Sequence, residues 1–160
     1  MRKIRKLVVT FLTICLICSC LSVITEAATA ELRFADPSTT VGAEVDVKTK
    51  LSSTSSMKSM EATLTYDKSE LKFISGDNAT ASDGKITISW TGTGTTAEFN
   101  LKFQALKEGT AKVEVANAAG TATDGTTLDI TQGSSAITIG AGDPSLIQDD
   151  TESQDTETTV

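Results

Sequence analysis

The sequence predicts an all-β domain, a nine-stranded β-sandwich. Three observations support this prediction. Apolar residues recur at every second position in short segments, no stretch after residue 30 repeats them at helical spacing for three turns, and turn-forming residues separate the segments. Strands with one apolar and one polar face are typical of two antiparallel sheets that pack face to face.

The predicted strands follow one another through a single domain at residues 31–142. This length is enough chain for one hydrophobic core. The nine segments that carry the alternation are residues 32–34, 43–51, 57–66, 71–75, 85–90, 97–105, 110–116, 127–130 and 136–139. Residues with turn preferences separate them, for example at 67–69, 83–84 and 92–94.

The alternation also assigns a face to each side chain, because successive side chains of a strand point to opposite sides. The predicted inward set is apolar and comprises Met60, Ala62, Leu64, Tyr66, Ile86, Ile88, Trp90, Phe99, Leu101 and Phe103. The predicted outward set is polar and comprises Ser59, Glu61, Thr63, Thr65, Thr87, Ser89, Asn100, Lys102 and Gln104. Burying each Leu, Ile or Phe stabilises the fold by roughly 1.5–3 kcal/mol, so we expect these sets to fix the strand register.

The first 30 residues have the pattern of an export signal. Four basic residues precede an apolar run at residues 7–24, and Ala28 and Ala30 form the small-x-small end that signal peptidase prefers. Two alternatives stay open: the apolar run is nearly long enough to remain as a membrane anchor, and Cys20 is a weak match to a lipidated cysteine. We therefore expect a secreted or cell-surface protein, which contacts a membrane only if the signal stays uncleaved or Cys20 is lipidated.

The chain after residue 30 is strongly acidic, with 10 basic against 20 acidic residues and a net charge of −10. Six of the acids follow residue 142, in a stretch without any basic or aromatic residue. We expect residues 143–160 to form a disordered acidic tail, because they cannot bury enough apolar surface to offset the entropy of ordering. The negative charge argues against nucleic acid and anionic lipid surfaces as partners.

The residue types exclude most catalytic chemistry. The chain has no histidine, and all three cysteines lie in the predicted signal, which removes zinc sites with N/S ligands, Ser-His-Asp triads and thiol nucleophiles. A glycosidase needs two carboxyl groups, one of them in an apolar environment, whereas Glu61 and Glu98 are predicted on the wet side of strands. We expect a protein that is not an enzyme, needs no cofactor and has no metal site of its own.

Four stretches occur in an order and spacing that carry a family resemblance. They are Val41-Gly42-x-x-Val45-x-Val47, Ala62-x-Leu64-x-Tyr66-Asp67-x-Ser69-x-Leu71, Phe99-x-Leu101-x-Phe103-x-Ala105 followed by Gly109-x-Ala111-x-Val113, and Gly133-x-Ser135-x-Ile137-x-Ile139. Each alone is only a strand pattern. Together, over residues 31–140, they resemble the cohesin modules of cellulosomes, within a superfamily of cohesin-like and carbohydrate-binding sandwiches. The resemblance implies jelly-roll topology.

For a true cohesin, the resemblance implies a non-catalytic module that binds a dockerin carried by a secreted protein of a polysaccharide-degrading assembly, with calcium bound by the dockerin. Because the family's dockerin lies across one sheet, the resemblance implies a set of partner-binding residues: Ser59, Glu61, Thr63, Thr87, Ser89, Asn100 and Lys102. Two departures from the family pattern frame that surface. The connection at 79–84 is short, and the eighth strand is poorly patterned.

Two other functions stay open. A carbohydrate-binding module of the same fold would bind polysaccharide on an exposed aromatic ring, for which Trp90 is the candidate, although the alternation places its ring inward. A structural spacer on the cell surface, which short loops and an acidic tail would suit, would bind no ligand.

Overall fold

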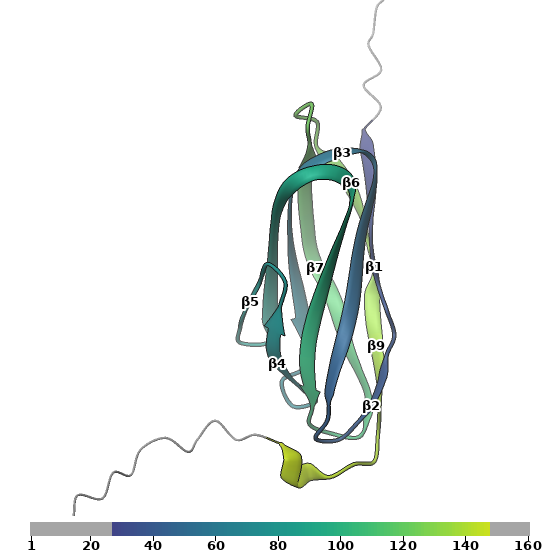
Figure 1. The fold of residues 1–160 in the computed structure, drawn as a ribbon, viewed down its shortest axis with the longest axis vertical. Coiled ribbons are helices and arrows are strands. Elements are labelled where there is room, and N and C mark those ends of the chain that lie inside the picture. The colour runs from purple at the N-terminus through teal and green to yellow at the C-terminus, as the bar shows by residue number, and fades with distance from the viewer. Residues whose placement is uncertain (1–26, 148–160) are drawn as a thin grey trace, which may run out of the picture.

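The computed structural model describes residues 27–147 and contains nine strands and one 3-10 turn (Figure 1). The strands are β1 (Ala28–Phe34), β2 (Ser38–Thr40), β3 (Glu44–Tyr66), β4 (Leu71–Gly76), β5 (Ala79–Ser82), β6 (Lys85–Ala105), β7 (Gly109–Ala122), β8 (Leu128–Gln132) and β9 (Ser134–Gly140), and the 3-10 turn is η1 (Pro144–Leu146). Most of the predicted export signal and of the predicted tail lies outside the described residues. Within residues 27–147, no helix has the length and apolar character needed to cross a membrane.

Two layers face each other across the core. Layer 1 consists, in order, of β5, residues 85–94 of β6, residues 57–66 of β3, and β7. Layer 2 consists of β4, residues 96–105 of β6, residues 44–52 of β3, β1 and β8. Hydrogen bonds connect all nine strands into one network, because β3 and β6 run through both layers and β9 joins β7 to β2. The chain is therefore the all-β sandwich, with jelly-roll topology, that the sequence predicts.

β3 and β6 stay paired and fold over together at the end of the molecule drawn at the top of Figure 1. The pairing register shifts between Ser52 and Met57, opposite residues 91–96, where Ser, Thr and Gly predominate. Small side chains and the positive φ of Gly94, 147°, let the ribbon bend, and the fully buried Met57 fills the inside of the bend. The prediction of a break in each strand was wrong, because the residues at 92–94 bend β6 without ending it.

The core consists of the inward sets that the alternation predicts. Met60, Ala62, Leu64, Ile86, Ile88, Phe99, Leu101 and Phe103 are each at most 3% exposed. Two predicted inward rings, Tyr66 at the end of β3 and Trp90 beside the bend of β6, are only partly buried and pack against this core. Tyr66 and Phe73 contact Phe103 edge to face, with ring centroids 5.5 and 5.6 Å apart.

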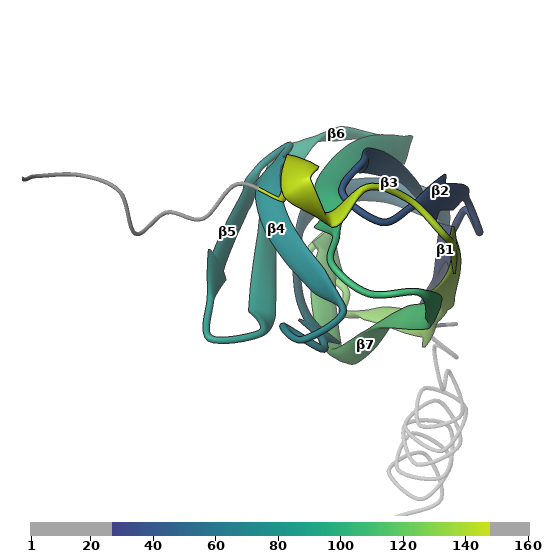
Figure 2. The ribbon, with the colours of Figure 1, turned by 90° about the horizontal axis from the view of Figure 1, so that it is seen from below.

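The sandwich is closed on one side and open on the other. On the closed side β1 pairs in parallel with β8, β2 pairs in parallel with β9, and β9 pairs with the beginning of β7. On the open side β4 and β5, seen at the left of Figure 2, pair only with β6. The sequence analysis predicted purely antiparallel sheets and missed β2 and β5, because these two strands have three and four mostly exposed residues without apolar alternation.

The segment after β9 crosses the end of the sandwich (Figure 2). It covers one polar side chain, Gln104. Gln104, predicted to be an outward and solvated residue, is only 6% exposed, since its Nε2 donates to the carbonyls of Gly42 at 3.0 Å and Leu146 at 2.9 Å. The alternation correctly places Gln104 on the outer side of its strand, but it contains no information about the segment that packs over it. The described chain continues through η1 to Ile147.

Gly42→Ala is expected to lower the free energy of unfolding by about 2 kcal/mol or more. Gly42 has a φ of 85°, and a Cβ there would lie 2.2 Å from the backbone oxygen of Asp143, so the covering segment would have to move. The matched control is Gly125→Ala, because Gly125 has a φ of 88° but nothing within 4 Å of its Cβ position. Urea denaturation of both variants separates the two effects; equal losses would contradict the contact with the covering segment.

Thr49→Val is expected to stabilise the protein by about 1 kcal/mol. Thr49 is 1% exposed, and its Oγ1 is buried without a hydrogen-bond partner in the described residues. Valine has nearly the same shape and carries no polar atom that needs a partner. Thermal unfolding measures the change, and Thr138→Val, on the exposed side of β9, is the control expected to leave the melting temperature nearly unchanged. A lower melting temperature for Thr49→Val would mean that the hydroxyl is satisfied.

Candidate partner-binding face

Five of the seven predicted site residues share the outer surface of layer 1. Ser59, Glu61 and Thr63 lie on β3, and Thr87 and Ser89 lie on β6. Each β3 residue has direct cross-strand neighbours on β6 and β7: Ser59 has Thr91 and Thr121, Glu61 has Ser89 and Ala119, and Thr63 has Thr87 and Asn117. Directly opposite side chains point to the same side of a sheet. We call these nine residues the polar face.

Small side chains surround a single carboxylate at the centre of the polar face. Glu61 is exposed, its direct neighbours Ser89 and Ala119 are short, and it has no ion pair among the described residues. Above it, Ser59 Oγ and Thr121 Oγ1 lie 2.8 Å apart and join β3 to β7 by a hydrogen bond. A partner can approach the Glu61 carboxylate closely, where a charge-assisted hydrogen bond would be strong.

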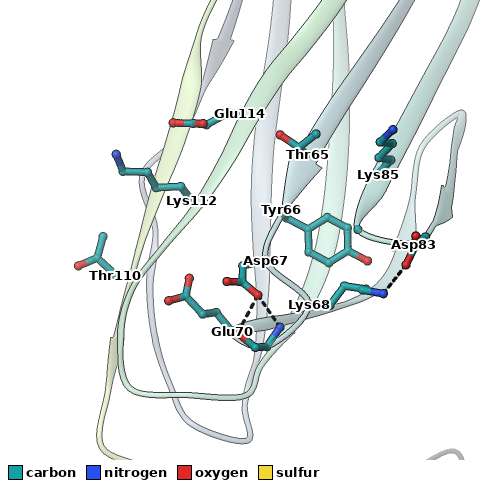
Figure 3. A pocket seen from close by; sticks show the side chains of 12 residues that line it. Thr65, Tyr66, Asp67, Lys68, Glu70, Asp83, Lys85, Thr110, Lys112 and Glu114 are labelled. Atoms are coloured by element: carbon teal, nitrogen blue, oxygen red, sulfur yellow. Dashed lines mark hydrogen bonds and ion pairs between the residues drawn. The ribbon is translucent and has the colours of Figure 1, made fainter.

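The polar face ends in an open hollow of about 980 Å³ at the corner between β3 and β4 (Figure 3). Thr65 continues the outward row of β3 into this hollow and lies opposite Lys85 on β6 and Glu114 on β7. The other lining residues are Tyr66, Asp67, Lys68, Ser69, Glu70, Asp83, Gly84, Thr110 and Lys112. The hollow and the polar face therefore form one continuous surface.

Local sequence builds the corner. Hydrogen bonds to Asp67 Oδ1 from the Ser69 hydroxyl at 2.7 Å and from the Ser69 N–H at 2.8 Å stabilise the turn and lower the pKa of Asp67. Asp83 and Gly84 have φ values of 51° and 74°, the combination that a two-residue type I′ hairpin requires. The Tyr66 N–H donates to the Gly84 carbonyl at 3.0 Å, which fixes this hairpin against the end of β3.

Only some of the charged side chains in the hollow form ion pairs with described residues. Lys68 Nζ forms a hydrogen bond and ion pair with Asp83, which lowers the pKa of Asp83 and raises the pKa of Lys68 (Figure 3). Lys85 and Lys112 form no ion pair with any described residue. Burial raises the pKa of Tyr66, so its hydroxyl is neutral at pH 7. Within residues 27–147, the hollow thus offers two ammonium groups outside any ion pair, beside a phenol and the carboxylates of Asp67, Glu70 and Glu114.

The other two predicted site residues, Asn100 and Lys102, do not belong to the polar face. They lie in layer 2, where they pair with Lys48 and Asp46 of β3. Lys102 Nζ lies 3.0 Å from Glu44 Oε2, and Asn100 Nδ2 donates to Asp46 Oδ1 at 2.9 Å. The prediction that they complete the same face was wrong, because β6 bends over at residues 91–96. Alternation shows that a side chain points away from the core, but it does not show to which of the two layers the residue belongs.

Trp90, the candidate residue for sugar binding, lies opposite Met60 on the inner side of layer 1. Its ring is partly buried against the core and lies over Gly92, where a Cβ would come within 2.7 Å of Trp90 Cζ2. The ring is therefore not the fully exposed platform that a sugar-binding surface would need.

The sequence analysis missed the β7 part of the surface, Asn117, Ala119 and Thr121. The region around residue 121 carries only a weak alternation, and no local signal identifies β7 as the neighbour of β3. The strongest available signal was Thr65, which alternation places in the same outward row and which leads to the hollow. Among residues 27–147, no group of three or more His, Cys, Asp or Glu residues is arranged to hold a metal ion.

No family model matches the chain, and no curated protein matches it. Solved structures do, among them several cohesin modules. The cohesin CaCohA2, in complex with the dockerin CaDoc0917, is 17% identical with a TM-score of 0.64; the alignment covers 70% of this chain and 100% of that one.

Two further structures come from different settings. A non-cellulosomal cohesin from the hyperthermophilic archaeon Archaeoglobus fulgidus is 13% identical with a TM-score of 0.60, over 72% of this chain and 92% of that one. A cohesin module from a Clostridium perfringens family 33 glycoside hydrolase is 15% identical with a TM-score of 0.58, over 74% and 100%. The chain has a cohesin-like fold, as its sequence resemblance implied.

Proposed function

We propose that this chain is a non-catalytic, exported binding module that holds a dockerin-bearing protein on the polar face. The observation that carries the proposal is the cohesin-like fold combined with an open, polar outer surface on layer 1, centred on Glu61, which has no ion pair among the described residues. Similar structures include a type I cohesin–dockerin complex from Clostridium thermocellum. The partner would supply the calcium sites, as the resemblance to cohesins implies.

The chemistry of the surface suits a polar protein partner. The hydroxyl groups of the polar face can form hydrogen bonds with a partner, and its short side chains let the partner approach closely. Glu61 favours a hydrogen-bond donor or a cation on the partner. At the lower end of the face Lys85 and Lys112 lie among the carboxylates of Asp67, Glu70 and Glu114, so this end offers charges of both signs to a partner. A partner with a basic or hydroxyl-rich centre would match Glu61.

The direct test is calorimetry of the mature protein against a panel of dockerins in the presence of calcium. Micromolar or tighter binding by at least one dockerin, lost when EDTA removes calcium, is the expected result. No binding by any member of the panel, or binding that is insensitive to calcium, would overturn the assignment of a dockerin partner.

A further inference from the structure

We infer that signal peptidase cleaves this chain between Ala27 and Ala28, three residues before the position that the sequence pattern favours. The inference rests on the proposed export of the protein. Water hydrolyses the Ala27–Ala28 peptide bond, which leaves a carboxylate on Ala27 and a new α-amino group on Ala28. The pair Ala28 and Ala30 is the clearest small-x-small match in the sequence, but both residues are part of the folded sandwich.

β1 needs its first three residues. Ala28 and Ala30 are 6% and 5% exposed, and they pair in parallel with Leu128 and Ile130 of β8. Cleavage after Ala30 would remove three of the five residue pairs between β1 and β8 and would uncover Leu128, which is 4% exposed.

Thr29 adds hydrogen bonds that the same cleavage would remove. Its carbonyl accepts from Ser53 Oγ at 3.0 Å and from Thr54 Oγ1 at 3.3 Å, and its N–H donates to Thr54 Oγ1 at 3.2 Å. These bonds tie the start of β1 to the bend of β3. The residues before Glu31 therefore belong to the folded domain and not to the part that export discards.

The sequence offers a second cleavage position that leaves β1 whole. Signal peptidase needs small residues directly before the cleaved bond and two positions earlier, and Ala27 and Thr25 meet this need for cleavage after Ala27. Cleavage after Ala28 would put Glu26 at the earlier position, where a charge is unsuitable. Ala27 is exposed and precedes the strand, so the mature chain would begin with the first residue of β1.

The test is N-terminal sequencing and intact mass of the full chain after secretion from a bacterial host. The expected mature protein begins Ala-Thr-Ala-Glu-Leu-Arg, at Ala28. A chain that begins at Glu31, a chain that begins at a lipidated Cys20, or an uncleaved chain would each overturn the inference.

Thr25→Asp distinguishes the two cleavage positions. A charge at residue 25 blocks cleavage after Ala27 but lies too far from the bond after Ala30 to affect it. We expect Thr25→Asp to abolish the form that begins at Ala28 and to leave either uncleaved precursor or a shorter form that begins at Glu31, whereas the control Glu26→Gln is processed like the wild type. Normal processing of Thr25→Asp would overturn the inference. Dockerin binding is measured separately on the secreted wild type. A protein that binds no dockerin would therefore contradict the proposed function but not the cleavage position.

Discussion

Glu61→Arg is expected to weaken binding of the proposed dockerin partner roughly 100-fold or more. Glu61 lies at the centre of the polar face, between the short side chains of Ser89 and Ala119, where an approaching partner would exclude water from the carboxylate. Reversing the charge there replaces an attraction with a repulsion and leaves a buried arginine without a partner. Calorimetry or surface plasmon resonance with the dockerin that binds the wild type measures the loss.

Glu98→Arg is the matched control for this variant. Glu98 is also an exposed acid on a strand, with a side-chain exposure of 77%, and its substitution changes the net charge equally, but it lies in layer 2 beside Lys50. We expect its effect on affinity to be less than about threefold, as for a surface ion pair outside the interface. An undiminished affinity of Glu61→Arg together with a loss for Glu98→Arg would place the partner on the opposite layer.

Phe103→Ala is expected to lower the free energy of unfolding by about 3–5 kcal/mol, a large share of the 5–15 kcal/mol that small domains have. Phe103 is fully buried, and its ring supports Tyr66 and Phe73 by edge-to-face contacts. Tyr66 also lines the hollow, so the space left by the missing Phe103 ring would loosen the lower end of the proposed binding surface. Urea denaturation followed by the fluorescence of Trp90, the single tryptophan of the chain, measures the effect.

Phe73→Ala is the comparison for Phe103→Ala, since Phe73 contacts the same ring but is only partly buried. Its loss of stability should be clearly smaller. Equal losses for the two variants, or a loss below about 1 kcal/mol for Phe103→Ala, would contradict the position of Phe103 at the centre of the core.

The sequence by itself determined which side chains point inward and which point outward. Met60, Ala62 and Leu64 are buried, and Glu61 and Ser89 are exposed, as the alternation predicts. This succeeds because the two-residue period of a strand is a local property, and because the burial of each large apolar side chain favours one register. The resemblance to cohesins likewise gave the correct fold, since it rests on the order of these strand patterns.

Only the tertiary structure decided which outward residues share a surface. Asn100 and Lys102 are as outward as Glu61, but the bend of β6 at residues 91–96 carries them to the opposite layer, and the segment through Leu146 covers Gln104. The pairing of β7 with β3 and of Ala28 with Leu128 joins residues that are far apart along the chain. Such contacts depend on how the whole chain closes around its core, and a local pattern of alternation carries no trace of them.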